Sequence, residues 1–116
     1  VKWMLSRGYE KNVVVLTRDV KYRKKANPKM QLFLKAVLHK YPAFLKDLEE
    51  RHIHYNETLE ELASLEKEGR IHIIRPSSPI QAAMIERDES NLERIYQTGR
   101  ADMKKDLEKL KAYLDS

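Results

Sequence analysis

The pattern of apolar and polar positions contains two short runs that predict β-strands. Residues 12–17 read Asn-Val-Val-Val-Leu-Thr, and residues 70–76 read Arg-Ile-His-Ile-Ile-Arg-Pro. β-Branched side chains fit the pleated surface of a sheet, so both runs favour strands over helices. The first run has no alternation of apolar and polar residues. We therefore expect both of its faces to be buried, as in an interior strand of a parallel α/β sheet.

Apolar residues spaced by three and four predict two long helices. One covers residues 42–68 and is closed by Gly69, and the other covers residues 88–114 with Asp88 as its N-cap. The expected apolar stripe of the first helix is Leu45, Leu48, His52, Tyr55, Leu59, Leu62 and Leu65. The expected stripe of the second is Leu92, Tyr96, Gly99, Met103, Leu107, Leu110 and Leu114. Because glycine inside a helix costs roughly 1 kcal/mol relative to alanine, we expect close packing against another element at Gly99.

Two shorter helices complete the predicted order. Residues 1–7 have the character of the last turns of a helix ended by Gly8, and residues 30–40 follow the helix-starting pair Asn27-Pro28. Residues 77–87 are expected to be a loop with one helical turn at most. The order is thus α–β–α–α–β–α. It predicts the α/β class, as the C-terminal part of a mostly parallel sheet flanked by helices, with a long C-terminal helix.

A two-stranded parallel sheet is not stable by itself, so the predicted strands need neighbours. The chain also opens at Val1 in what reads as the middle of a helix. We therefore expect an upstream part of the same protein, or another copy of the chain, to complete the sheet. We interpret residues 1–116 as one unit in three parts: residues 1–29 (helix end, buried strand and basic loop), residues 30–76 (helical crossover and second strand), and residues 77–116 (loop and C-terminal helix).

Composition favours a folded chain. It is 41% hydrophobic and 35% charged, which leaves enough apolar material for a core. No apolar run approaches the ~20 residues that cross a bilayer, and no signal-peptide pattern opens the sequence. Cysteine is absent, which excludes disulfides and thiol catalysis and agrees with a reducing compartment. We expect a cytoplasmic location, with peripheral attachment to a membrane as an open alternative.

Positive charge is concentrated near the first predicted strand. Residues 1–40 hold eleven Lys and Arg residues and two acidic residues, a net charge of +9, whereas residues 41–116 have a net charge of −4. Ligands of open α/β sheets bind beyond the carboxyl ends of strands, where the basic segment 18–29 begins. The candidate contacts to phosphate or lipid headgroups are Arg18, Lys21, Arg23, Lys24 and Lys25. The alternative is a solvated surface loop.

Residues for catalysis, metals or cofactors are not evident. His52 and His54 are two apart on a predicted helix, so they face different directions and cannot chelate one ion. His52 lies on the apolar stripe, and we interpret it, like His72, as a packed structural histidine. Ser6 resembles the end of a G-x-S-x-G motif, but it precedes a strand instead of following one. With three glycines in the chain, no phosphate-cradling loop is present. The sequence therefore predicts no catalytic residue, no metal ligand and no cofactor.

Several stretches across the chain resemble the sequences of a known family outside its catalytic motifs. They are residues 8–18, Tyr22 to Lys25, Tyr41-Pro42, Arg51-His52 with Tyr55 to Thr58, Ile73 to Ser77, and the last helix with Leu92, Tyr96 and Gly99. Together they resemble the C-terminal third of the bacterial patatin-like phospholipases. None of these stretches is a catalytic signature. The family often has Arg-Pro where this chain has Arg18-Asp19, which leaves the local loop conformation open.

The resemblance implies a serine lipid acyl hydrolase with a Ser-Asp dyad. In that family the serine lies in G-x-S-x-G and the aspartate in an Asp-Gly-Gly/Ala motif, and this sequence contains neither. It therefore implies that these residues form a structural, non-catalytic segment that completes the sheet and contributes its basic loop to the lip of the active site. The implied partners are the lipid or ester substrate of the full-length protein and an anionic membrane surface.

Two other functions remain open from sequence. The basic segment would also suit a nucleic-acid-binding module, although the acidic balance of residues 41–116 counts against it. The stripes of the two long helices would suit a helical protein-interaction module, although packing onto the sheet explains them more simply.

Overall fold

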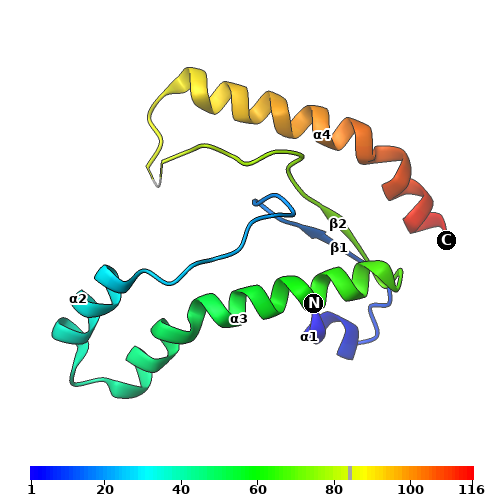
Figure 1. Cartoon of the computed structure of the whole chain (residues 1–116). Coiled ribbons are helices and arrows are strands. Elements are labelled where there is room, and N and C mark those ends of the chain that lie inside the picture. Colours follow the sequence, from blue (N-terminus) through cyan, green and yellow to red (C-terminus); the bar gives the residue numbers. More distant parts are fainter. Residues whose placement is uncertain (84) are drawn as a thin grey trace. The chain divides into compact units, whose positions relative to one another are not determined.

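The computed structural model describes residues 1–83 and 85–116 and contains helices and strands in the predicted order (Figure 1). The mixed α/β class, the parallel pair of strands and the long C-terminal helix are confirmed. The elements are α1 (Lys2–Ser6), β1 (Asn12–Val15), α2 (Pro28–Leu38), α3 (Pro42–Lys67), β2 (Ile71–Ile74) and α4 (Glu89–Asp115). Both strands are shorter than expected, and no helical turn forms in the described residues between β2 and α4.

Local sequence signals set the helix ends. Gly8 and Gly69 have positive φ angles of 86° and 73°, which a residue with a Cβ adopts only at a cost. At Gly69 the backbone N–H of Arg70 donates to the carbonyl of Leu65, and the N–H of Gly69 donates to Glu66, which is the Schellman pattern. The Asn27 side chain caps α2, and the Asp88 side chain caps α4. The chain therefore turns where these residue types predict.

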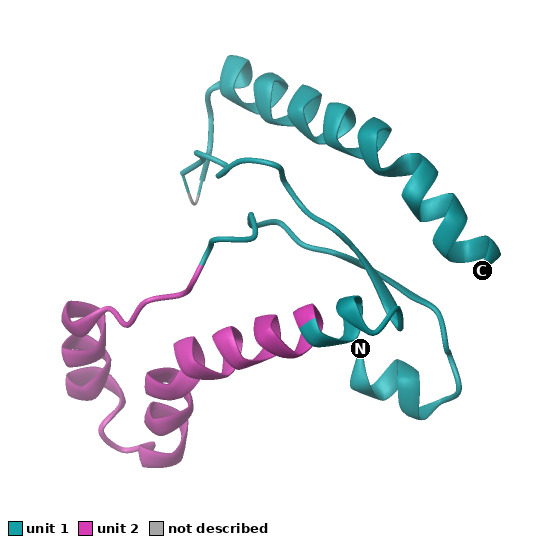
Figure 2. Cartoon of the chain, turned by 45° about the vertical axis from the view of Figure 1, so that its right-hand side comes forward, with its two compact units in different colours: residues 1–22, 64–116 teal, residues 23–63 magenta. Residues whose placement is uncertain are grey.

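The chain divides into two compact units (Figure 2). Unit 1 contains residues 1–22 and 64–116, which include α1, both strands, the end of α3 and α4. Unit 2 contains residues 23–63, which are the connection to α2, α2 itself and most of α3.

In unit 1 the two strands pair in parallel, with Val13 opposite His72 and Val14 opposite Ile73. The backbone N–H of Leu16 extends the pairing with a 2.8 Å hydrogen bond to the carbonyl of Ile74. Because parallel strands run in one direction, β1 and β2 end together. We call this end the carboxyl edge.

The expectation that both faces of the first strand are buried is wrong for the described chain. In β2, Ile71 and Ile73 are 2% and 6% exposed, whereas in β1, Val13 and Val15 are 41% and 68% exposed. The physical reason is that β1 pairs with β2 alone in the described residues, while α4 packs against β2. One apolar face of β1 therefore meets solvent in this chain.

The two long helices differ in how well the sequence predicted their buried sides. Every residue of the predicted stripe on α3 is buried or half-buried, so that stripe is confirmed. The stripe predicted for α4 is confirmed at Met103 and Leu110, which are half-buried. It is wrong at four other apolar members, which lie on the exposed side: Leu92, Tyr96, Leu107 and Leu114. The half-buried side of α4 instead contains Asn91, Ile95, Thr98, Asp102, Met103, Asp106, Leu110 and Tyr113.

Close packing at Gly99 is also not found. A Cβ placed there would meet no heavy atom within 4 Å, so the glycine is not required by a neighbouring element within the described chain.

Candidate functional site

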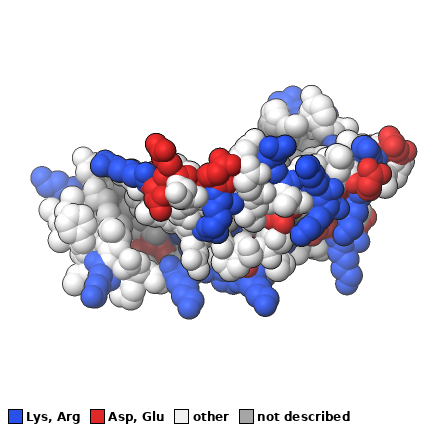
Figure 3. All heavy atoms as spheres, turned by 90° about the horizontal axis from the view of Figure 1, so that it is seen from above, with Lys and Arg blue, Asp and Glu red and all other residues white. Residues whose placement is uncertain are grey.

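The candidate basic residues are divided between the two units. Arg18 and Lys21 belong to unit 1, whereas Arg23, Lys24 and Lys25 belong to unit 2. On the face drawn in Figure 3, Lys and Arg side chains are interleaved with Asp and Glu side chains. The structure therefore describes two smaller basic groups, and we consider each within its own unit.

Arg18 follows β1 at the carboxyl edge, as the sequence predicts. Its guanidinium lies 5.0 Å from the centroid of the Tyr22 ring, which is a cation–π distance. It lines an open hollow together with Thr17, Ile80, Ala82 and Ala83, and none of the described lining residues is acidic. Lys21 lies in a tight turn, in which its backbone N–H donates to the Asp19 carboxylate at 2.9 Å.

An apolar hollow of about 360 Å³ lies beside Arg18 at the same edge. Its walls come from the ends of both strands, from Pro76 and Ile80, and from the side of α4 around Gly99. Aliphatic side chains dominate the lining: Val15, Leu16, Ile74, Ile80, Ile95 and Met103. Such a surface suits the aliphatic part of a ligand or the side chains of another polypeptide segment, because both lose contact with water there.

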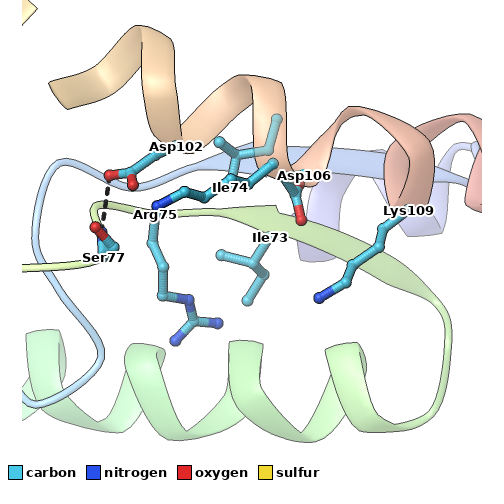
Figure 4. Close-up of a pocket in the computed structure, with 8 residues that line it drawn as sticks. Ile73, Ile74, Arg75, Ser77, Asp102, Asp106 and Lys109 are labelled. Carbon is cyan, nitrogen blue, oxygen red and sulfur yellow. Dashed lines mark hydrogen bonds between the residues drawn. The ribbon is translucent and has the colours of Figure 1, made fainter. Parts of the chain in front are cut away.

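A second, polar hollow of about 200 Å³ lies between β2 and α4 (Figure 4). The backbone N–H of Ser77 donates to the Asp102 carboxylate at 2.9 Å. This bond, and then one from the Ser77 side chain, hold the pKa of Asp102 below its usual value. Arg75 is paired with Glu66 at 2.6 Å. Because basic and acidic groups alternate here, the hollow has little net charge. The Ser77–Asp102 bond attaches α4 to the segment after β2, and the Arg75–Glu66 pair attaches that segment to the end of α3.

His72 is held by the same helix. Its Nε2 lies 2.5 Å from the Asp106 carboxylate, and its ring stacks on Tyr113 with 5.6 Å between centroids. The Tyr113 hydroxyl donates to the carbonyl of Arg70 and accepts from the backbone N–H of Asn12. The structural interpretation of His72 agrees with this half-buried network. Sequence reasoning missed Asp106, because 34 residues separate it from His72 and no motif connects them.

Unit 2 contains a hollow of about 160 Å³ that we call the basic pocket. The connection before α2 provides two lysines to it, the first turns of α2 provide apolar residues, and the middle of α3 provides two further basic residues. Its characteristic lining residues are Lys24, Lys25, Asn27, Met30, Arg51 and His52. The structure thus brings two candidate residues together with two residues for which the sequence predicted no ligand.

The two lysines are positioned by α3. The Asn56 side chain accepts from the backbone N–H of Lys24 at 2.9 Å and donates to the Lys24 carbonyl at 3.0 Å. The Lys24 ammonium also lies 5.6 Å from the centroid of the Tyr55 ring. This two-point attachment, over 32 residues of sequence, fixes the backbone beside the pocket. No spacing in the sequence indicates it.

The remaining candidate groups have structural partners. The Ser6 hydroxyl donates to the carbonyl of Trp3 at 2.8 Å inside α1. His54 is paired with Glu57 and Glu50, and the Glu57 bond is the main cause of its raised pKa. No group of three or more metal-binding side chains occurs in residues 1–83 and 85–116. In the same residues, no helix has the length and apolar character required for a bilayer crossing.

These features define a mixed α/β protein with a parallel strand pair, an open carboxyl edge and a separate basic pocket. The family model described as "Domain of unknown function (DUF6363)" matches residues 41–115, and the chain belongs to this family. The matched region contains α3, β2 and α4, and it excludes β1 and the basic segment. No curated protein and no solved structure matches the chain.

Proposed function

We propose that this chain is the C-terminal segment of a patatin-like lipid acyl hydrolase, in which it is structural and non-catalytic. The observation that carries the proposal is the uncovered apolar face of β1, where Val13 and Val15 are exposed. A strand of three consecutive valines has the composition of a sheet interior. An upstream part of the same protein would pair further strands with the edge of β1 and cover this face with the helices that connect them.

The same proposal is supported by sequence resemblance to patatin-like phospholipases in residues 8–18, 22–25 and 73–77. It also accounts for the absence of G-x-S-x-G and Asp-Gly motifs in the sequence, because the Ser-Asp dyad would lie upstream. The substrate of the full-length protein is then a lipid or another ester. Arg18 at the carboxyl edge and Lys21 in the adjacent turn would contact anionic headgroups, together with the basic residues of unit 2.

The catalytic part of the proposal is tested on the complete reading frame. We expect G-x-S-x-G and Asp-Gly-Gly/Ala upstream of Val1, and hydrolysis of a short-chain p-nitrophenyl ester by the full-length protein. Changing the motif serine to alanine should abolish turnover, and the chain of 116 residues should have none. A complete frame without both motifs would overturn the proposal.

The membrane part is tested by cosedimentation with vesicles of phosphatidylcholine and phosphatidylglycerol. We expect reversal of Lys21, Arg23, Lys24 and Lys25 to Glu to abolish binding at low salt. A matched control reverses four lysines outside the basic segment, Lys40, Lys67, Lys104 and Lys109, and should retain most of the binding. Equal loss in both variants would mean that net charge alone acts. Unchanged binding in the first variant would exclude the headgroup role.

A further inference from the structure

We propose that the basic pocket of unit 2 is a binding site for a phosphate monoester. The inference rests on the proposed function in one respect, the assignment of Lys24 and Lys25 to an anionic ligand. It adds the class of that ligand and two residues of α3, Arg51 and His52. All four of these residues line one hollow in unit 2.

The first argument is charge. Three cations, Lys24, Lys25 and Arg51, line the pocket, and no Asp or Glu is among the lining residues. Glu49, whose backbone carbonyl bonds to His52, is paired with Lys35 of α2 at 2.9 Å. In the described part of the chain, no carboxylate forms an ion pair with Lys25 or Arg51. Because like charges repel when they share a hollow, an anion bound there is stabilised by all three cations.

The second argument is preorganisation. Asn56 holds the backbone of Lys24 at two points, and the Asn27 side chain caps α2 by accepting from the N–H of Met30 at 3.1 Å. The positive end of the α2 dipole therefore points to the side of the pocket where the lysines lie. A site whose backbone is already fixed spends little entropy when the ligand binds.

The third argument concerns His52. Its Nδ1 lies 2.8 Å from the carbonyl of Glu49, so Nδ1 carries the hydrogen and donates it. Nε2 is then an acceptor on the neutral ring and a second donor on the protonated ring. It can therefore bond either to a hydroxyl or to an oxygen of a phosphate group.

Size and lining select the ligand class. The pocket volume of about 160 Å³ is smaller than the roughly 300–1,000 Å³ typical of drug-sized ligands, so it suits a phosphate group with a few carbon atoms. Met30, Leu34 and Leu48 offer an apolar surface to those carbons. A phosphate monoester carries about −1.5 to −2 charges at pH 7 and has three acceptor oxygens. Three cations therefore complement a phosphate monoester better than a carboxylate, which has one negative charge and two oxygens.

The site is tested by NMR titration of the full chain with glycerol phosphate, with acetate as the comparison anion. We expect saturable shifts at Lys25, Arg51 and His52 with glycerol phosphate and weak, non-saturable shifts with acetate. Arg51→Gln should weaken binding about tenfold or more, because it removes charge-assisted hydrogen bonds. Lys40→Gln, an exposed lysine of the same unit outside the pocket lining, is the matched control and should bind like the original chain.

Two results would overturn the pocket: no saturation with glycerol phosphate, or the same affinity in Arg51→Gln and Lys40→Gln. Arg51→Lys provides a second variant, which retains the charge without the planar fork and should bind between the original chain and Arg51→Gln. A helical circular dichroism spectrum equal to that of the original chain confirms that each variant is folded.

Vesicles distinguish the source of the phosphate group. Phosphatidic acid presents a monoester and phosphatidylglycerol a diester. If the ligand is a lipid headgroup, Arg51→Gln should reduce binding to phosphatidic acid vesicles and leave phosphatidylglycerol binding unchanged. If glycerol phosphate binds but vesicles do not, the basic pocket binds a soluble phosphate monoester, and the proposed membrane role is excluded. If vesicle binding depends on Lys21 and Arg23 but glycerol phosphate does not bind, the phosphate site in the basic pocket is excluded and the membrane role is retained.

Discussion

At the scale of single residues, hydrogen bonds decide which side of α4 faces the sheet. Asp102, Asp106 and Tyr113 each bond to a backbone group or side chain of the segments beside them. A half-buried carboxylate or hydroxyl without such partners would lose its bonds to water without replacement. The side of α4 with these three polar groups therefore packs inward, together with Ile95, Met103 and Leu110, whereas Leu92 and Tyr96 remain exposed.

Asp102 gives a prediction on pH. Because hydrogen bonds from Ser77 lower its pKa in the folded state, Asp102 contributes stability above its unfolded pKa of about 3.9. That contribution is lost as the pH falls through the folded value. Asp102→Asn should lower the free energy of unfolding by about 1 kcal/mol at neutral pH, since solvent screens this bond. In urea titrations, the difference in free energy of unfolding between Asp102→Asn and the original chain should vanish in acid. Asp115→Asn, near the C-terminus, is the control, and a difference that persists in acid would contradict the assignment.

Gly99 gives a prediction of the opposite sign. It lies inside α4, where alanine is favoured over glycine by about 1 kcal/mol, and a Cβ there meets no heavy atom within 4 Å. Gly99→Ala should therefore raise the free energy of unfolding of the isolated chain by about 0.5 to 1 kcal/mol. Chemical denaturation measures it. Loss of stability would mean that another segment occupies the adjacent apolar hollow.

At the scale of elements, one turn connects the end of α3 to β2 within unit 1. Gly69 ends α3, and β2 begins at Ile71, with Leu65 and Ile71 buried on either side. The left-handed φ of Gly69 lets the chain reverse within two residues while the last helix carbonyls keep their hydrogen bonds.

Gly69→Ala should destabilise the chain by about 1 kcal/mol, because a Cβ disfavours the left-handed conformation. Thermal unfolding, followed by the far-ultraviolet circular dichroism signal of the helices, measures the loss. Glu68→Ala, one residue earlier, is the control and should change little. If Gly69→Ala left the melting temperature unchanged while Gly99→Ala raised it, the assigned cap would be wrong.

At the scale of the whole molecule, the exposed face of β1 is the feature that the described chain leaves incomplete. Val15 is exposed at the last position of the strand, next to the apolar hollow at the carboxyl edge. An uncovered edge strand of this composition is a site for pairing with another strand. The proposed upstream sheet would remove that exposure.

Val15→Lys distinguishes the two states of this face. In the chain of 116 residues it should change the free energy of unfolding by less than about 0.5 kcal/mol, as at other exposed positions. In the full-length protein it should cost about 2 kcal/mol or more, because the charge would be buried. Ile73→Ala, at a buried position, should cost about 2 to 4 kcal/mol in both and serves as the control. Equal, small effects of Val15→Lys in both proteins would contradict the proposed sheet.

The sequence determined the features that depend on neighbours within a few residues. The order of elements, the cap at Asp88, the ends at Gly8 and Gly69, and the buried stripe of α3 follow from local residue types and spacing. These features agree with the structure because backbone conformation and helical periodicity are set over one or two turns.

Tertiary structure alone decided what depends on distant partners. The inward side of α4 follows from bonds such as that between His72 and Asp106, and the exposure of Val15 follows from which elements pack on the face of β1. The basic pocket likewise exists because Asn56 attaches the backbone of Lys24 to α3, close to Arg51. No local pattern encodes these contacts, because each forms between segments that only the fold brings together.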